Sequence, residues 1–143
     1  MLAELMRTLV DALAAPTIFA LLLVTALSVL DAGAAIGERL LGLARLAEAD
    51  PERVTQLARR RIERADLLAR VGPMLGLMGT LIPLGPGLAA LGQGNVALLA
   101  DAVTVAFDTT VLGLLVGVIG FVLSRLRRRW YDRLLDTMEV ARG

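Results

Sequence analysis

The chain has 143 residues, of which 57% are hydrophobic and 20% charged, and its formal net charge is +1. With a mean hydropathy of +0.71, this composition excludes an ordinary soluble domain and indicates a membrane protein. The sequence has no cysteine and no histidine, which excludes disulfides and the commonest soft metal ligands, so we expect neither a metal nor a cofactor.

The N-terminal segment begins with apolar residues at helical spacing. This spacing predicts a short helix over residues 1–11 that lies on the outer membrane surface before the chain turns inward. A first membrane span follows at residues 12–30, with Pro16 near its first turn. A cleavable signal peptide is the weaker alternative, because two acidic residues accompany Arg7 where such a peptide needs a positive leader.

Residues 37–70 are rich in arginine and separate the first two spans. Asp50 and Pro51 form a helix start, with an acceptor side chain at the cap and a proline at the position where its missing N–H does no harm. An apolar stripe at helical spacing follows. We therefore predict a helical hairpin extension at 37–70, packed against the first helix or against a neighbouring subunit.

Two further spans are predicted at residues 71–91 and 102–124, joined by a turn rich in glycine. All fifteen basic residues are arginine, and apart from Arg7 they lie at 39–70 and 125–142. The positive-inside rule makes these two regions cytoplasmic and the topology N-out, C-in. The sequence therefore predicts a single all-α domain of three transmembrane helices with a basic tail at 125–143, multi-pass in the cytoplasmic membrane.

Thr80 and Thr110 lie near the middle of the second and third spans. At about 1.5 Å of rise per residue, their heights in the membrane differ by less than one helical turn. Pro83 has no N–H to donate to the carbonyl of Gly79, which predicts a kink and a free acceptor beside Thr80. Because hydroxyls and a free carbonyl at this depth can carry a file of water, we take both threonines as candidate ion-pathway residues.

Asp108 is the third candidate for the ion pathway. It lies about 9 Å from the outer edge of its span, where an ionised carboxylate costs about 2.5 to 3.5 kcal/mol or more. It points about 200° away from Thr110 around the helix, so the two cannot face one narrow pore. With Asp101 and Thr104 it forms a second polar stripe. A structural partner across a subunit interface and a role in ion entry are both open for Asp108.

The second and third spans each have a narrow face of small residues, which allows close approach of two helix backbones. Gly113 and Gly117 form a GxxxG pair, and tight helix association is the simplest interpretation of that motif. The expected packing residues are Gly76, Gly79, Gly113 and Gly117.

Residues 73–80 read P-M-L-G-L-M-G-T, which resembles the P-L-L-G-L-L-G-T stretch of the MotA/TolQ/ExbB proton-channel proteins. Residues 106–114 read A-F-D-T-T-V-L-G-L and are similar to that family's A-L-x-x-T-A-x-G-L, with Thr110 and Gly113 on its threonine and glycine. The ExbB and TolQ branch fits best, since the cytoplasmic part is much shorter than in the flagellar branch.

The resemblance implies a proton-motive-force-driven motor. Five such subunits would surround a central pore that holds single-span partner helices of the ExbD or TolR type, each with an intramembrane aspartate. Because Thr80 and Thr110 match the family's two threonines, the resemblance implies that they face that carboxylate. The resemblance leaves proton or sodium as the ion. Three positions depart from the pattern: Val105 replaces a common acidic residue, Pro83 a common glycine, and Ile119 a proline.

Two other functions stay open. A holin-like or scaffold oligomer would use the glycine faces for packing alone, and a transporter subunit lacks the expected inverted repeat. No nucleophile and base pair, metal cluster or phosphate-binding loop can be assembled, so we expect no enzyme activity. The arginine run at 59–61 is read as a topology signal that contacts lipid headgroups, and we expect no nucleic-acid partner.

Overall fold

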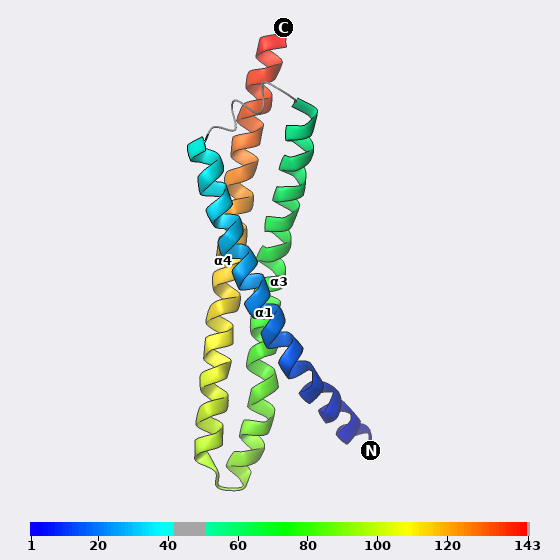
Figure 1. Cartoon of the computed structure of the whole chain (residues 1–143). Helices are drawn as coiled ribbons and strands as arrows, with labels where there is room; N and C mark the ends of the chain where they lie inside the picture. Colours follow the sequence, from blue (N-terminus) through cyan, green and yellow to red (C-terminus); the bar gives the residue numbers. More distant parts are fainter. Residues whose placement is uncertain (42–50, 143) are drawn as a thin grey trace.

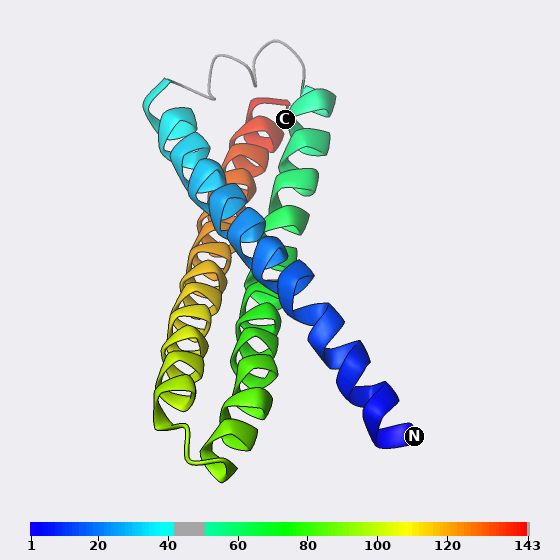
Figure 2. The same cartoon turned by 60° about the horizontal axis from the view of Figure 1, so that its bottom comes forward.

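The computed structural model describes the backbone of residues 1–41 and 51–142, and the side chains of 1–37, 56, 57 and 59–133. Within these residues the chain forms the helices α1 (Leu2–Leu41), α3 (Pro51–Gly92) and α4 (Val96–Arg142). Helices α3 and α4 lie antiparallel and side by side, and α1 crosses them obliquely (Figures 1 and 2). The predicted all-helical architecture is confirmed.

Each helix contains a segment that is long and apolar enough to cross a membrane: Leu2–Gly37, Arg59–Gly92 and Val96–Arg133. The three predicted spans fall inside these segments, so the prediction of three helices long and apolar enough to cross a membrane is confirmed. The N-terminus and the turn between α3 and α4 lie toward the same end of the bundle (Figure 1). This arrangement is the one that a chain with three successive crossings requires.

The prediction of a separate surface helix at the N-terminus is wrong. Helix α1 runs without a break from Leu2 through Pro16 to Leu41. Pro16 removes one backbone hydrogen bond, but the residues on both sides of it keep the same helical period and no turn signal separates them. One proline is therefore not enough to divide this helix, and it lies well inside α1 instead of near its first turn.

The extension between the first two spans is partly described. Helix α3 begins at Pro51, as the helix-start motif predicts, while Asp50 and the rest of 42–50 lie outside the described residues. From Pro51 the helix continues into the second span with no interruption. Its buried Ala65 packs with Ala35 of α1 and Leu123 of α4. The extension is thus a continuation of the helices that cross the membrane.

Small residues line the contact between α3 and α4, which we call the glycine seam: Gly72, Gly76 and Gly79 on α3, and Gly113, Gly117 and Gly120 on α4. A Cβ added at Gly113 would lie 2.6 Å from the Cα of Gly76 and 2.7 Å from the carbonyl oxygen of Gly72. One at Gly117 would lie 2.7 Å from the ring of Pro73. The two backbones can come this close because no side chain separates them.

Replacing Gly113 with alanine is expected to lower the free energy of unfolding by about 1 to 3 kcal/mol, because the new methyl group overlaps backbone atoms that cannot move aside. Unfolding in detergent micelles, followed by circular dichroism, measures this loss. Gly33→Ala is the matched control, since nothing lies within 4 Å of a Cβ built at Gly33. Equal stability of the two variants would contradict the close approach.

Burial along α1 is uneven. Every residue from 1 to 13 is exposed, and the buried positions begin at Thr17 and continue through Leu21, Ser28 and Ala35. These positions recur every four or seven residues, so one stripe of α1 faces α3 and α4. The C-terminal part of α1 is therefore docked, whereas its N-terminal part projects away from the pair (Figure 2).

Candidate functional site

Thr80 of α3 and Thr110 of α4 lie in direct contact, joined by a hydrogen bond between their hydroxyl groups. Both hydroxyls also lie within hydrogen-bond distance of the carbonyl of Ala106, at 3.2 Å for Thr80 and 2.8 Å for Thr110. Thr80 reaches the carbonyl of Gly76 at 2.9 Å as well. The equal height predicted from the rise per residue is thus confirmed, and the two helices share one small hydroxyl cluster.

The hydroxyl cluster lies on the side of the α3 and α4 pair that faces away from α1. The cavity between α1 and this pair is lined by Ile82 and Val105. Thr80 is two residues from Ile82, about 200° of helical rotation, and Thr110 is five residues from Val105, about 140°. Both threonines are only partly buried. Their hydroxyls are therefore available to a neighbour that approaches from the side opposite α1.

Thr109 is a buried residue of this region that the sequence did not single out. It is 6% exposed, and a Cβ at Gly79 would lie 2.7 Å from the Thr109 Cβ. Its hydroxyl donates to its own helix, with the carbonyls of Val105 and Ala106 at 2.9 and 3.0 Å. The sequence could have indicated its burial, because Thr109 lies four residues before Gly113 and therefore on the same helix face as the glycine seam. Thr109 therefore packs against Gly79 of α3, whereas the hydroxyl of Thr110 forms a hydrogen bond with that of Thr80.

The kink at Pro83 and the free carbonyl of Gly79 stay predictions. The hydroxyl of Thr80 lies within hydrogen-bond distance of the carbonyls of Gly76 and Ala106. The reason is local, since a threonine inside a helix readily bonds the carbonyl four residues before it. Helix α3 continues through Pro83, which lines the cavity beside α1. Pro83 thus borders that cavity, while Thr80 takes its acceptors from Gly76 and Ala106.

Asp108 is exposed and lies apart from the hydroxyl cluster, as its rotation of about 200° from Thr110 predicts. Asp101 and Thr104 are exposed as well, and we call these three residues the acidic stripe of α4. The hydroxyl of Thr104 bonds the carbonyl of Ala100 in its own helix at 2.9 Å. The acidic stripe therefore faces outward from the single chain.

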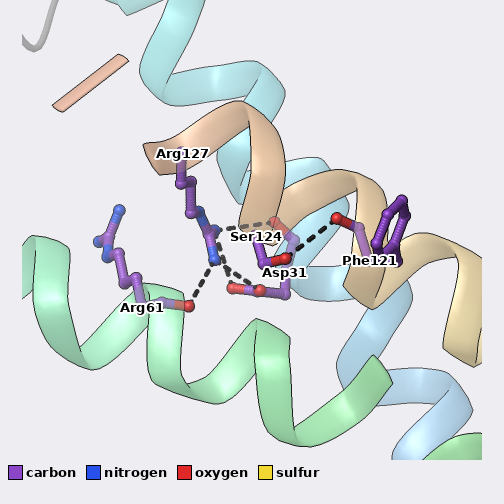
Figure 3. Close-up of polar contacts among 5 residues, drawn as sticks. All are labelled: Asp31, Arg61, Phe121, Ser124 and Arg127. Atoms are coloured by element: carbon purple, nitrogen blue, oxygen red, sulfur yellow. Dashed lines mark hydrogen bonds and ion pairs between the residues drawn. The ribbon is translucent and has the colours of Figure 1, made fainter. Parts of the chain in front are cut away.

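A buried ion pair ties α1 to α4 and was missed from the sequence. The guanidinium of Arg127, 1% exposed, donates from Nη1 to Asp31 Oδ2 at 2.7 Å and from Nη2 to Asp31 Oδ1 at 3.0 Å (Figure 3). Nη1 also donates to the carbonyl of Arg61 on α3 at 3.1 Å. All three helices therefore meet at this guanidinium, while its Nε is buried with no partner among the described residues.

No group of three or more acidic residues that could hold a metal ion occurs among the described residues. The side chains that do gather are hydroxyls, backbone carbonyls and one ion pair. These hydrogen-bond donors and acceptors lie within segments that are long and apolar enough to cross a membrane.

A family model described as the MotA/TolQ/ExbB proton channel family matches residues 22–140. The chain belongs to this family. The match includes both threonines of the hydroxyl cluster, the whole glycine seam and the Asp31–Arg127 pair. A search of curated proteins and a search of solved structures gave no match.

Membership of the MotA/TolQ/ExbB family confirms the resemblance seen in residues 73–80 and 106–114. Together with the three apolar helices, it makes the chain a multi-pass membrane protein of a proton-channel family. Val105, where the resemblance implies an acidic residue, lines the cavity beside α1 in this chain.

Proposed function

We propose that the chain is the multi-span subunit of an ion-driven membrane motor of the ExbB and TolQ type. Identical copies, five by analogy with the family, surround a pore, and each contributes the face that carries Thr80 and Thr110. Single-span partner helices occupy the pore, and an aspartate on the partner accepts and releases the transported proton. The complex lies in the cytoplasmic membrane with the N-terminus outside.

The contact between Thr80 and Thr110 is the observation that carries this proposal. Helices α3 and α4 bring these hydroxyls together from positions 30 residues apart, on the side away from α1. A membrane helix gains little from an exposed hydroxyl pair unless a polar neighbour meets it. A carboxyl group on a partner helix is such a neighbour, because it can donate to or accept from a hydroxyl as its protonation changes.

The glycine seam supports the same assignment in a different way. Backbones that touch at Gly76 and Gly113 make α3 and α4 a rigid pair. A pore wall made of rigid pairs keeps the hydroxyls at one height when copies are related by rotation about an axis along the helices. A partner carboxyl that rotates or slides in the pore would then meet the hydroxyls of successive copies at the same level.

Purification of the chain from its native membrane decides between this motor and a scaffold oligomer. We expect a small protein with one membrane span and an intramembrane aspartate to be recovered with it, in a complex with several copies of the chain. Native mass spectrometry gives the copy number and the identity of the partner. Recovery of a homo-oligomer alone, from membranes in which the one-span protein is present, would favour the scaffold.

A further inference from the structure

The N-terminal part of α1 extends past α3 on the side away from α4. In Figures 1 and 2 the blue end of α1 lies beyond the green helix α3, whereas the cyan end lies on the other side of the pair, next to α4. Residues 1–13 are all exposed, including large apolar side chains such as Leu5 and Leu9. This part of α1 therefore leaves a wide apolar surface uncovered within the single chain.

A groove separates this part of α1 from α3. It consists of two adjoining cavities of about 230 and 330 Å³ that share Asp11, Ile82 and Pro86. Gly85 lines the larger one, and a Cβ built there meets nothing within 4 Å. Gly85 lies nine residues from Gly76, about 180° of helical rotation, so the larger cavity opens on the side of α3 opposite its own α4, while the smaller one reaches Val105 of that helix.

Two charged side chains line the groove, Asp11 and Arg7, and Arg7 is the positive one. Arg7 is the one arginine outside the two cytoplasmic groups and lines the larger cavity. It forms no ion pair with another described residue of the chain. An arginine beside an apolar groove gains from an acidic partner that enters with an apolar helix.

The acidic stripe of α4 has the matching properties. Asp101 and Asp108 are exposed, and they lie about 120° and 140° of rotation from Gly113 in the glycine seam. The stripe therefore faces neither the chain's own α3 nor the side that carries Thr110. Apolar side chains such as Val111 and Leu115 continue the exposed surface toward the middle of the membrane.

The heights of the two surfaces agree. A Cβ at Gly87 would lie 2.7 Å from the Cβ of Ala102, which puts Asp101 level with this part of α3. Arg7 lines a cavity together with Gly85 and Ala89, two residues on either side of Gly87. Copies related by rotation about an axis along the helices keep these levels, so Arg7 of one copy and Asp101 of the next are within one helical turn in height.

We propose that the N-terminal part of α1 is a strap that holds the next copy of this chain, with α4 of that copy seated in the groove and its Asp101 paired with Arg7. In a ring whose walls alternate α3 and α4, the helix beside α3 on the side opposite its own α4 is α4 of the neighbour. The strap covers the acidic stripe of that helix. This inference rests on the homo-oligomer of the proposed function.

The absence of cysteine makes the contact directly testable in the full-length chain. One population carries Arg7→Cys and one affinity tag, and the other carries Asp101→Cys and a second tag. Both are expressed together in membranes and treated with a short reagent that bridges two thiols. A direct disulfide is not the probe, because it needs Cα atoms about 4.4 to 6.8 Å apart and an arginine–carboxylate pair holds them further apart.

We expect a cross-linked dimer that carries both tags. The matched control is Val103→Cys, which lies two residues from Asp101 at nearly the same height but about 200° around α4. It should give at least several-fold less dimer with Arg7→Cys. Equal yields from Asp101 and Val103 would overturn the strap. The strap would also be overturned if no cross-linked dimer formed while native mass spectrometry showed an intact ring. That is the result expected if lipid, and not α4 of the next copy, fills the groove.

A second measurement tests the charge pair without cysteine. Arg7→Asp should lower the fraction of assembled rings in native mass spectra, and adding Asp101→Arg should restore it, because the pair is then reversed and not removed. Failure of the double variant to recover would overturn the pairing. A chain that is monomeric even without substitution would instead refute the proposed function, so the two failures are distinguishable.

Discussion

Valine in place of Thr80 is expected to reduce proton flux through the assembled complex about a hundredfold, the lower range for loss of a positioned proton-transfer group. Valine keeps the shape of threonine but replaces with a methyl group the hydroxyl that bonds Thr110 and the carbonyl of Ala106. In the proposed pathway, this change interrupts the series of donors and acceptors beside the partner carboxyl. Proton uptake into vesicles that contain the complex of the chain and its partner measures the flux.

Thr109→Val is the matched control for this experiment. Thr109 is the buried neighbour of Thr110, and its hydroxyl bonds only carbonyls of its own helix among the described contacts. Its loss should leave the flux within about twofold, since an intrahelical hydroxyl bond contributes little to the net stability of the fold. Thr110→Val should behave like Thr80→Val, and normal flux in both of these variants would refute the assigned pathway.

Removal of the charge on Asp31 is expected to give the largest loss of stability. Asp31→Asn leaves the guanidinium of Arg127, 1% exposed, without a counter-charge at the junction of all three helices. Breaking a buried ion pair from one side costs about 3 to 5 kcal/mol. Denaturant titration in mixed micelles measures the change in the free energy of unfolding.

Asp66→Asn provides the comparison at a similar depth. Asp66 pairs with Arg128, whose side chain is 60% exposed, so its loss should cost about 1 kcal/mol or less. Replacing both members of the buried pair, with Asp31→Leu and Arg127→Met, should recover most of the stability that Asp31→Asn loses. Equal costs for Asp31→Asn and Asp66→Asn would show that burial does not set the strength of the inner pair.

The sequence predicted the similar heights of Thr80 and Thr110 because these heights follow from local properties. Thr80 and Thr110 are 30 residues apart, yet a tight turn near Gly94 joins the two helices and fixes their antiparallel register. The rise per residue then gives both heights without any knowledge of packing. The glycine faces were readable for the same reason, since their spacing follows the helical period.

Other features could not be read in this way. The ion pair joins Asp31 to a residue 96 positions later, and the length and composition of each helix are the same whether or not they meet. Whether Thr109 is buried and whether Pro83 lines a cavity depend on the side of the glycine seam on which each side chain lies. The continuity of α1 through Pro16 was missed because proline is a weak stop where no turn signal follows it.

The sequence by itself determined the number of membrane-crossing helices, the pairing of the second with the third, and the height of the two threonines, since hydrophobic length, helical period and a short turn are local quantities. Only the tertiary structure decided how α1 crosses the other two helices, which arginine meets Asp31, and which faces stay open for other chains. Those outcomes depend on side chains that fit across helices distant in sequence, and such a fit is a property of the packed chain alone.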